Sequence, residues 1–161
     1  SVVEEIGVTD QWAYESLRKF KELYPVDEFN RECHRELYTT GAMMLEFNSE
    51  LMNFKRSYHI PKGLEYKGPN AKIQGTAAYV IKHAMKRCDE RIRKERWVGK
   101  VDMVLQVHDE LIFEVDNHLP FIKEVNQAMG EEMDDLVTFK VPITTSGKWS
   151  PISLGDVKEF E

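Results

Sequence analysis

Three consecutive polar residues, His108-Asp109-Glu110, interrupt an otherwise apolar-rich stretch that runs from Val101 to Val115. Adjacent carboxylates repel each other, and hard oxygen ligands of this kind suit Mg²⁺ or Mn²⁺, whose charge would relieve the repulsion. A divalent metal site at Asp109 and Glu110 is therefore one interpretation. An acidic turn exposed to solvent is the alternative, and the pair taken alone favours that alternative.

The residues on both sides of this trio alternate between apolar and other side chains with a period of two. The apolar positions are Val101, Met103, Leu105 and Val107 before the trio, and Leu111, Phe113 and Val115 after it. This period is typical of β-strands, and two strands separated by so few residues must form a tight hairpin. The predicted turn, at about His108 to Glu110, lacks the Asn-Gly or Asp-Gly pair that two-residue turns prefer. Its sequence therefore indicates a functional constraint on the turn.

Three strings in the second half of the chain resemble segments of the family A DNA polymerases, the bacterial DNA polymerase I type. QVHDELIFEV resembles motif C, NAKIQGTAAYVIKHAMKR resembles the segment that precedes motif C, and VPITTSGKW resembles the closing segment of the family. The strings occur in the family's order and at its separation. The resemblance is strong from about Asn70 to Trp149 and holds only in outline over the first 69 residues.

This resemblance implies a DNA-directed DNA polymerase that uses two divalent metal ions about 4 Å apart, with Mg²⁺ expected and Mn²⁺ as its substitute. Asp109 corresponds to the motif C aspartate that binds metal directly, and we expect Glu110 to be an auxiliary acid near the metals. His108 resembles the family histidine that lies near the primer terminus. A histidine that only satisfies a turn carbonyl is the alternative for its side chain.

A second group of candidate residues lies upstream of the hairpin. Asn70 and Gln74 are four residues apart, so both side chains project from one face of a helical turn, where amides could donate to base-edge acceptors in the minor groove. Their spacing matches the family's Asn and Gln that contact the primer-template duplex. From the residues alone, an N-cap Asn and an exposed Gln remain the alternative.

The formal net charge of -6 argues against a generic nucleic-acid binder, but the charge is unevenly distributed. Residues 70–100 hold nine Lys or Arg against three acids, whereas residues 109–161 hold twelve acids against four Lys. In the polymerase interpretation the basic segment, with Lys86 and Arg87, contacts the duplex backbone. Two solvated faces of opposite sign are the alternative.

Two positions depart from the family's pattern. The family usually has Arg four residues before the Asn that corresponds to Asn70, where this chain has Tyr66. It also has Asp after the Ala pair, where this chain has Tyr79. The first departure puts the details of duplex contact in doubt, and the second is expected to alter a structural hydrogen bond.

The chain of 161 residues, 42% of them hydrophobic, is long enough to bury one ordinary globular core. It has no apolar run long enough to span a bilayer and no leader-like beginning, which argues against membrane insertion and secretion. Cys33 and Cys88 are far apart and outside any CxxC spacing, which favours a reducing cytoplasm over disulfides or a zinc site.

Periodicity predicts an α+β fold, in which an antiparallel palm-type sheet containing the hairpin is packed by long helices as part of a larger polymerase fold. In the first third we expect a helix that starts at Thr9 or Asp10 and stops at Pro25, and a second helix over residues 26–40. The first helix would bury Trp12, Leu17, Phe20 and Tyr24 or their neighbours. If it packs on another part of a polymerase, those aromatic side chains would be partly exposed in this chain alone.

Residues 42–47 are predicted to be a strand and residues 48–69 largely a loop, which could include a short turn of helix. A helix of more than five turns then starts near Asn70, with an apolar stripe of Ile73, Ala77, Ile81, Ala84, Cys88 and Ile92. After the hairpin we expect a helix capped by Asn117, with Pro120 in its first turn and a buried stripe of Phe121, Ile122, Val125, Met129 and Met133. Phe139, Val141 and Ile143 would form a third strand, at an edge because of Pro142.

These elements suggest two parts, with fingers-derived helices and a connecting loop over residues 1–69 and the C-terminal palm portion over residues 70–161. We find no string like the family's DYSQIELR strand, which carries the partner aspartate, or its RxxxKxxxFGxxYG helix, which binds the incoming nucleotide. The chain therefore resembles the C-terminal part of the polymerase, either a subunit of a split enzyme or a cut piece.

We expect the partners of this part to be primer-template DNA, deoxynucleoside triphosphates and an N-terminal polymerase portion that carries the missing motifs. Alone, the chain should not polymerise. Two other hypotheses stay open: a non-catalytic module that binds duplex DNA, and a metal-dependent phosphohydrolase that uses Asp109 and Glu110.

Overall fold

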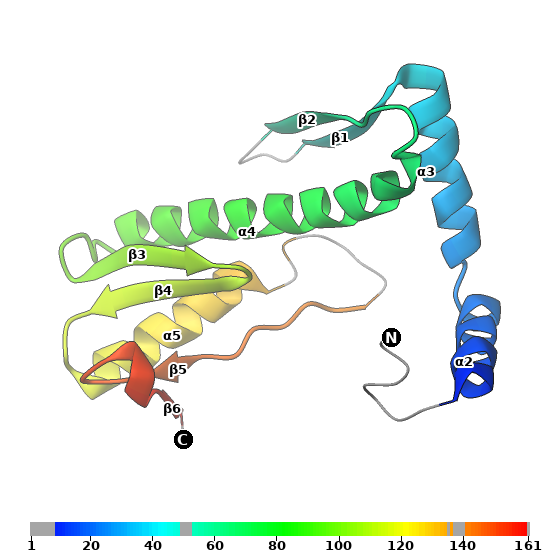
Figure 1. Ribbon diagram of the computed structural model, residues 1–161. Helices are drawn as coiled ribbons and strands as arrows, with labels where there is room; N and C mark the ends of the chain where they lie inside the picture. Colours follow the sequence, from blue (N-terminus) through cyan, green and yellow to red (C-terminus); the bar gives the residue numbers. More distant parts are fainter. Residues whose placement is uncertain (1–8, 49–52, 135, 137–140, 161) are drawn as a thin grey trace. The chain divides into compact units, whose positions relative to one another are not determined.

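A computed structural model of the protein describes residues 9–48, 53–134, 136 and 141–160. Figure 1 shows the helices and strands of the chain. The contacts between residues group the chain into two units. The first unit comprises residues 1–45 and 55–74, and the second comprises residues 46–54 and 75–161. The predicted division between residues 69 and 70 stays a prediction.

The first helix, α2 (Asp10–Leu23), begins where predicted. The Oγ1 atom of Thr9 accepts the backbone N–H of Trp12 at 3.2 Å, which caps the helix. No residue of α2 is buried. The predicted burial of Trp12, Leu17, Phe20 and Tyr24 is therefore wrong for this chain by itself, where their exposed fractions are 47–56%. The first unit forms its core on the next helix, so the apolar side chains of α2 stay exposed.

That next helix, α3 (Val26–Thr40), has the predicted bounds and ends at Gly41, whose φ of 71° is the left-handed conformation of a helix C-cap. Cys33 and Leu37 on α3 are buried together with Met43, which lies in strand β1 (Ala42–Asn48). Phe29, Tyr58 and Ile60 pack against this cluster. The first unit thus has a small core between α3 and the strands that follow it.

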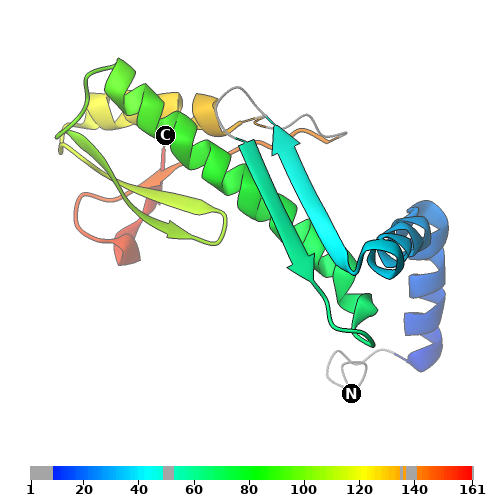
Figure 2. The same cartoon turned by 90° about the horizontal axis from the view of Figure 1, so that it is seen from above.

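The strand predicted over residues 42–47 is confirmed, whereas the loop predicted over residues 48–69 is wrong over residues 53–59, and residues 49–52 lie outside the described residues. Strand β2 (Asn53–His59) pairs with β1 in a two-stranded sheet, and the two strands run in opposite directions (Figure 2). Pairing supplies the backbone hydrogen bonds, and the guanidinium of Arg56 lies 4.8 Å from the centre of the Tyr58 ring. A short 3₁₀ helix, η1 (Glu65–Lys67), leads to the next element.

The long predicted helix is α4 (Gly68–Lys94), and it starts two residues before Asn70. The predicted burial of its apolar stripe is confirmed in the C-terminal half, where Ala84, Cys88 and Ile92 are buried. It is wrong at the N-terminal end, where Ile73 and Ala77 are exposed. The first turn of α4 instead packs against the core of the first unit at Gly68. A Cβ atom at Gly68 would lie only 2.5 Å from Leu37 Cδ1, so the backbone of α4 approaches the first core there.

The second unit has its core between a hairpin and two helices. The hairpin consists of β3 (Val101–Val107) and β4 (Glu110–Val115), and it is followed by α5 (Leu119–Met133). Cys88 and Ile92 of α4 are buried with Trp97, Val101, Val125, Ala128 and Met129. Met103, Leu111, Phe113, Val115, Phe121 and Met133 pack against this cluster. One face of the hairpin is therefore covered by the end of α4 and by α5.

The predicted helix after the hairpin is confirmed, with Pro120 in its first turn, but His118 and not Asn117 is its N-cap. The predicted third strand is wrong for Val141 and Ile143, which are exposed and irregular, and Phe139 lies outside the described residues. The carboxylate of Asp134 accepts the backbone N–H of Thr145 at 2.6 Å and its hydroxyl at 2.8 Å, so this segment bonds to the end of α5 instead of to a sheet.

The chain ends with β5 (Lys148–Trp149), η2 (Leu154–Asp156) and β6 (Lys158–Glu159), the two strands pairing antiparallel. The described residues contain helices and small antiparallel sheets joined by irregular segments, and the predicted α+β class is confirmed. Within those residues, no helix combines the length and apolar character needed to cross a membrane.

Candidate functional site

The hairpin places the His108-Asp109-Glu110 trio at its tip. Val107 pairs with Glu110 in the antiparallel register, so His108 and Asp109 are the two residues of the turn. All three side chains of the trio are exposed. The predicted tight turn is confirmed, and Asp109 and Glu110 are held next to each other where a ligand in solution can reach them.

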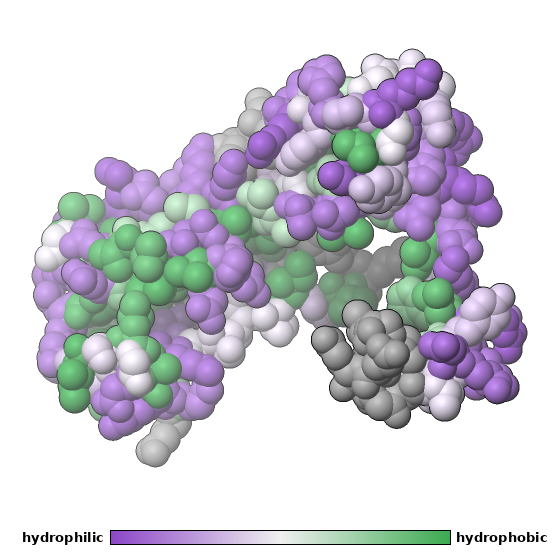
Figure 3. Space-filling view, viewed as in Figure 1, coloured by the Kyte–Doolittle hydropathy of each residue, from purple (hydrophilic) through white to green (hydrophobic). Residues whose placement is uncertain are grey.

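A β-bulge at Val104 changes which side chains face the core. The register shifts between Met103 and Leu105, and an extra residue in one strand moves all later side chains to the opposite face. Leu105 and Val107 consequently lie 49% and 39% exposed, although strict alternation places them with the buried Val101 and the partly buried Met103. Apolar side chains gather on the visible surface of the β3–β4 hairpin (Figure 3).

The turn contains a residue in a conformation that most side chains avoid. His108 has φ of 53°, in the left-handed region, where Asn, Asp and His are the commonest residues besides Gly. The side-chain Nε2 of Gln106 donates to the carbonyl oxygen of His108 at 2.5 Å. Sequence reasoning missed the contribution of Gln106, and the absence of Gly from the turn was the signal that an additional contact is needed there.

The residues present fit a divalent metal in part. Asp109 and Glu110 supply adjacent carboxylate oxygens, the donor type that Mg²⁺ prefers. In the part of the chain that the structure describes, no group of three or more His, Cys, Asp or Glu side chains is placed to hold a metal ion. These two carboxylates therefore amount to a partial ligand set.

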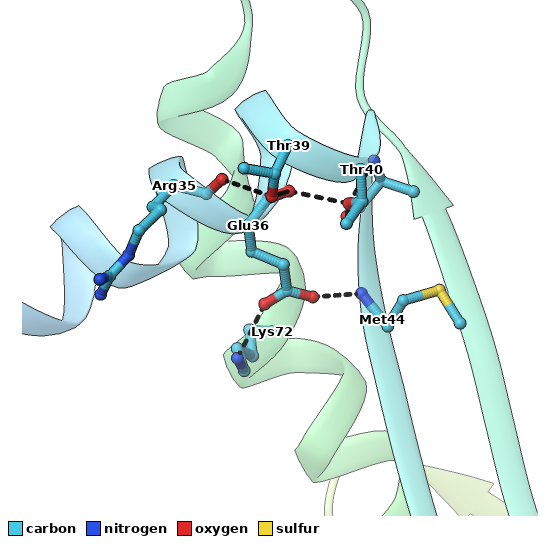
Figure 4. Close-up of polar contacts among 7 residues, drawn as sticks. Arg35, Glu36, Thr39, Thr40, Met44 and Lys72 are labelled. Carbon is cyan, nitrogen blue, oxygen red and sulfur yellow. Dashed lines mark hydrogen bonds and ion pairs between the residues drawn. The ribbon is translucent and has the colours of Figure 1, made fainter.

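The other candidate residues, Asn70 and Gln74, lie on the first two turns of α4 and are both exposed. Asn70 is the third residue of the helix, so it is not an N-cap. Between them, Lys72 binds a carboxylate oxygen of Glu36 at 3.2 Å, and the other oxygen of Glu36 accepts the backbone N–H of Met44 at 2.7 Å (Figure 4). Glu36 thus fixes the helix turn from which both amides project.

Lys86 and Arg87 have different surroundings although they are neighbours in sequence. Lys86 is exposed, whereas Arg87 is half-buried against α5. The guanidinium of Arg87 binds one oxygen of Glu132, with Nη2 at 2.7 Å and Nε at 2.8 Å. Arg91, one turn along, also contacts Glu132, at 3.3 Å. Part of the basic flank of α4 is therefore bound to the acidic end of α5.

The two departures from the family's pattern have clear structural contexts. Tyr79 is buried, and its ring stacks on Phe47 with centroids 4.3 Å apart and on His83 at 5.6 Å. Burial, and then the nearby charges of Arg87 and Lys86, hold the pKa of His83 below its ordinary value. Tyr66 is exposed, and the ammonium of Lys67 lies 5.9 Å from the centre of its ring.

A comparison with family models assigns the chain to a family. The model described as DNA polymerase family A matches residues 1–152, which is most of the chain. The chain belongs to DNA polymerase family A. Its resemblance to that family, recognised in the strings around Asp109 and Asn70, is confirmed.

Individual proteins agree with this assignment. The chain is 28% identical to DNA polymerase I of Geobacillus stearothermophilus over 156 residues, which is 93% of this chain and 17% of that protein. It is 32% identical to DNA polymerase I of Helicobacter pylori over 123 residues, 74% of this chain and 13% of that protein. The matched part of the chain thus spans only 13–17% of the length of these relatives.

A solved structure also matches. It is the POL domain of Pol1 from M. smegmatis in complex with DNA primer-template and dNTP, with a TM-score of 0.65 and 25% sequence identity. The match covers 87% of this chain and 25% of that one. The fold described above is therefore similar to part of a polymerase domain.

Proposed function

We propose that this chain is the C-terminal part of a DNA-directed DNA polymerase and contributes one side of its active site. The observation that carries the proposal is the position of Asp109, exposed at the tip of a two-residue hairpin turn, in a chain that belongs to DNA polymerase family A. A duplex-binding module without catalysis would not need adjacent carboxylates at that tip. A phosphohydrolase would need more ligands than these two residues provide.

In this function Asp109 would bind Mg²⁺, or Mn²⁺ in its place, and Glu110 would lie near it as an auxiliary acid. The ions, when bound, would lower the pKa of the attacking hydroxyl and neutralise charge that develops on the phosphates. His108 would lie near the primer terminus. Because all three residues come from one turn, the shape of that turn fixes their mutual geometry.

The proposed DNA contacts come from α4. Asn70 and Gln74 would contact base edges of the primer-template in the minor groove, where amide side chains meet acceptor atoms. The Glu36 contacts with Lys72 and Met44 support this role, because they fix the turn that presents both amides. Lys86 and Arg87 would contribute positive charge toward the phosphate backbone, and the bond to Glu132 makes Arg87 the less available of the two.

The remaining requirements of polymerisation would come from an N-terminal polymerase portion. That portion would carry the partner aspartate and the helix that binds the incoming deoxynucleoside triphosphate. We therefore propose that the chain does not polymerise alone, and that a complex with this portion is the active species.

The test mixes this chain with a polypeptide that carries the missing motifs and measures Mg²⁺-dependent extension of a labelled primer on a template. We expect template-directed synthesis from the mixture and none from either component. Asp109→Ala should abolish it, whereas Asp116→Ala, which removes an acid from the opposite end of the hairpin, should leave it close to the unsubstituted level.

Two results would contradict the proposal. One is primer extension at the full rate by the isolated chain. The other is full activity of the complex with Asp109→Ala. Duplex binding that persists without any synthesis by the mixture would instead support the non-catalytic module.

A further inference from the structure

We propose that Gln106 is a positioning residue for Asp109, because its side-chain amide selects one of two orientations of the peptide bond between His108 and Asp109. The inference rests on the proposed function, in which Asp109 is the metal ligand. It concerns a residue outside the trio and explains how the trio is held.

The turn has the φ signs of a type II′ turn. His108, the first central residue, has a positive φ of 53°. Among the described non-glycine residues, only His108 and Arg96 have positive φ, so the φ of Asp109, the second central residue, is negative. Type I′ turns, the other common two-residue hairpin turns, have positive φ at both central residues. The two types differ by a rotation of the central peptide unit, which here joins His108 to Asp109.

The turn residues themselves do not decide between these two types. Type II′ favours Gly at the first central position, which is His108 in this chain. Type I′ would place Asp109 in the left-handed region, which Asp tolerates better than most residues. Something outside the turn must therefore determine whether Asp109 has negative or positive φ, and this choice re-aims its carboxylate.

Gln106 contacts the group that would move. Its Nε2 donates to the carbonyl oxygen of His108 at 2.5 Å, and this oxygen belongs to the central peptide unit itself. Rotation of that unit would carry the oxygen away and break the bond. The bulge at Val104 sets up the contact, because the shifted register places Gln106 opposite Leu111, one pair away from the Val107 and Glu110 pair that closes the turn.

The orientation of this peptide unit affects the reaction through the position of the Asp109 carboxylate. Catalytic constellations need their groups held within about 0.5 Å of the productive geometry, and a misplacement of about 1 Å can cost a hundredfold in rate. A turn that samples both orientations would present Asp109 correctly for only part of the time. We therefore expect loss of the Gln106 donor to lower kcat of the assembled polymerase about tenfold, with the KM for nucleotide little changed.

The first measurement uses NMR on the full 161-residue chain and needs no polymerase activity. A type II′ turn gives a weak NOE between the amide protons of His108 and Asp109, and a rotated central peptide brings these protons together. We expect a weak NOE in the unsubstituted chain and a strong one in Gln106→Met, which keeps the shape and removes the donor. Gln106→Lys, which restores an N–H donor, should weaken the NOE again.

The second measurement follows primer extension by the same variants in the complex with the polypeptide that carries the missing motifs. Gln127→Met is the matched control, since Gln127 also donates from its amide, to Glu131 at 3.0 Å, but lies on α5. We expect kcat to fall with Gln106→Met, to recover in part with Gln106→Lys and to stay unchanged with Gln127→Met. Urea unfolding midpoints should be the same for all of these chains.

Several outcomes would overturn the inference. An unchanged NOE in Gln106→Met would show that the amide does not select the orientation. A changed NOE with unchanged kcat would show that the orientation does not matter, and a kcat loss that follows a lowered unfolding midpoint would assign Gln106 a structural role only. Full activity of Asp109→Ala, by contrast, would contradict the proposed function while the NOE result could still stand.

Discussion

Arg87 on α4 and Glu132 on α5 form an ion pair in which two guanidinium nitrogens, Nη2 and Nε, approach the same carboxylate oxygen at 2.7 and 2.8 Å. The side chain of Glu132 is only 17% exposed, so it is partly withdrawn from water. Arg91 approaches its other oxygen at 3.3 Å. The pair therefore joins the two helices that cover the hairpin, and this structural contact competes with any contact that Arg87 makes to DNA.

The first prediction separates Lys86 from Arg87. Arg87→Ala should lower the free energy of unfolding by about 1 kcal/mol, because it leaves a partly buried carboxylate with one partner fewer. Lys86→Ala, at an exposed position, should change it by less than about 0.5 kcal/mol. In the assembled enzyme, Lys86→Ala should reduce the slope of log binding constant against log salt by about 1 if its ammonium meets a phosphate.

Urea unfolding and DNA-binding titrations at several salt concentrations provide these measurements. Lys123→Ala, on α5, serves as the control for removal of one exposed positive charge from the same unit. An unchanged salt slope in Lys86→Ala would assign that side chain to a solvated face. A larger loss of stability from Lys86→Ala than from Arg87→Ala would contradict the roles given to the two residues here.

The second prediction tests the β-bulge with two residues of the same strand. Met103 packs against the second core, and Leu105 lies beyond the bulge on the exposed face. Met103→Thr should therefore lower the free energy of unfolding by about 2 kcal/mol, whereas Leu105→Thr should change it by less than about 0.5 kcal/mol. Chemical denaturation of the two variants decides the matter. Equal losses of unfolding free energy in the two variants would contradict the bulge and would support the strict alternation of side chains that the sequence suggests.

Much of the hairpin was accessible from the sequence, because a period of two and a turn of two residues are local properties. The bulge was not, since Val104 and Leu105 are both apolar and either could have faced the core. The first unit shows the same difference. The C-terminal end of α3 could be predicted because Gly41 is a local signal for a helix end. Strand β2 could not, because its side chains do not alternate clearly and it exists through its pairing with β1.

The candidate site divides in the same way. Asp109 and Glu110 could be predicted because the motif and the turn lie within one short string. The bond between Gln106 and the turn depends on the bulge. The bond between Arg87 and Glu132, which are 45 residues apart in sequence, depends on the approach of two helices. It is a tertiary contact, which no local pattern indicates. Gln106 lies only two residues from His108, but its bond depends on a strand register that the alternation of side chains does not reveal.

The third prediction concerns the thiol of Cys88. Burial raises its pKa to about 12, and burial likewise raises the pKa of the Cys33 thiol. The thiolate is the reactive form, so neither cysteine should be alkylated by iodoacetamide at pH 8 in the folded chain, and both should react in urea. Mass spectrometry of the two reactions gives the answer. Rapid alkylation of Cys88 without urea would mean that the core between α4, α5 and the hairpin opens readily.

The last prediction concerns stability at low pH and follows from His83. Its ring is buried beside Tyr79, and burial together with Arg87 and Lys86 holds its pKa below the ordinary value, while Glu90 acts weakly in the opposite direction. The unfolded chain, in which the pKa is about 6.5, therefore takes up a proton at a higher pH than the folded chain does. Stability contributed by the neutral ring should be complete above about pH 7 and should be lost as the pH falls below about 6.5.

Urea unfolding at pH 5, 6, 7 and 8 measures this dependence. His83→Phe keeps an aromatic ring next to Tyr79 but cannot take up a proton, so its stability should fall less between pH 7 and pH 5 than that of the unsubstituted chain. His59→Gln is the control, because His59 is exposed on β2 and its removal should leave the pH dependence unchanged. If His83→Phe and the unsubstituted chain lost stability in parallel over this range, another group would have to be responsible. The carboxylates that pair with Arg87 and Arg91 would then be the next groups to test, since protonating them would also loosen α4 from α5.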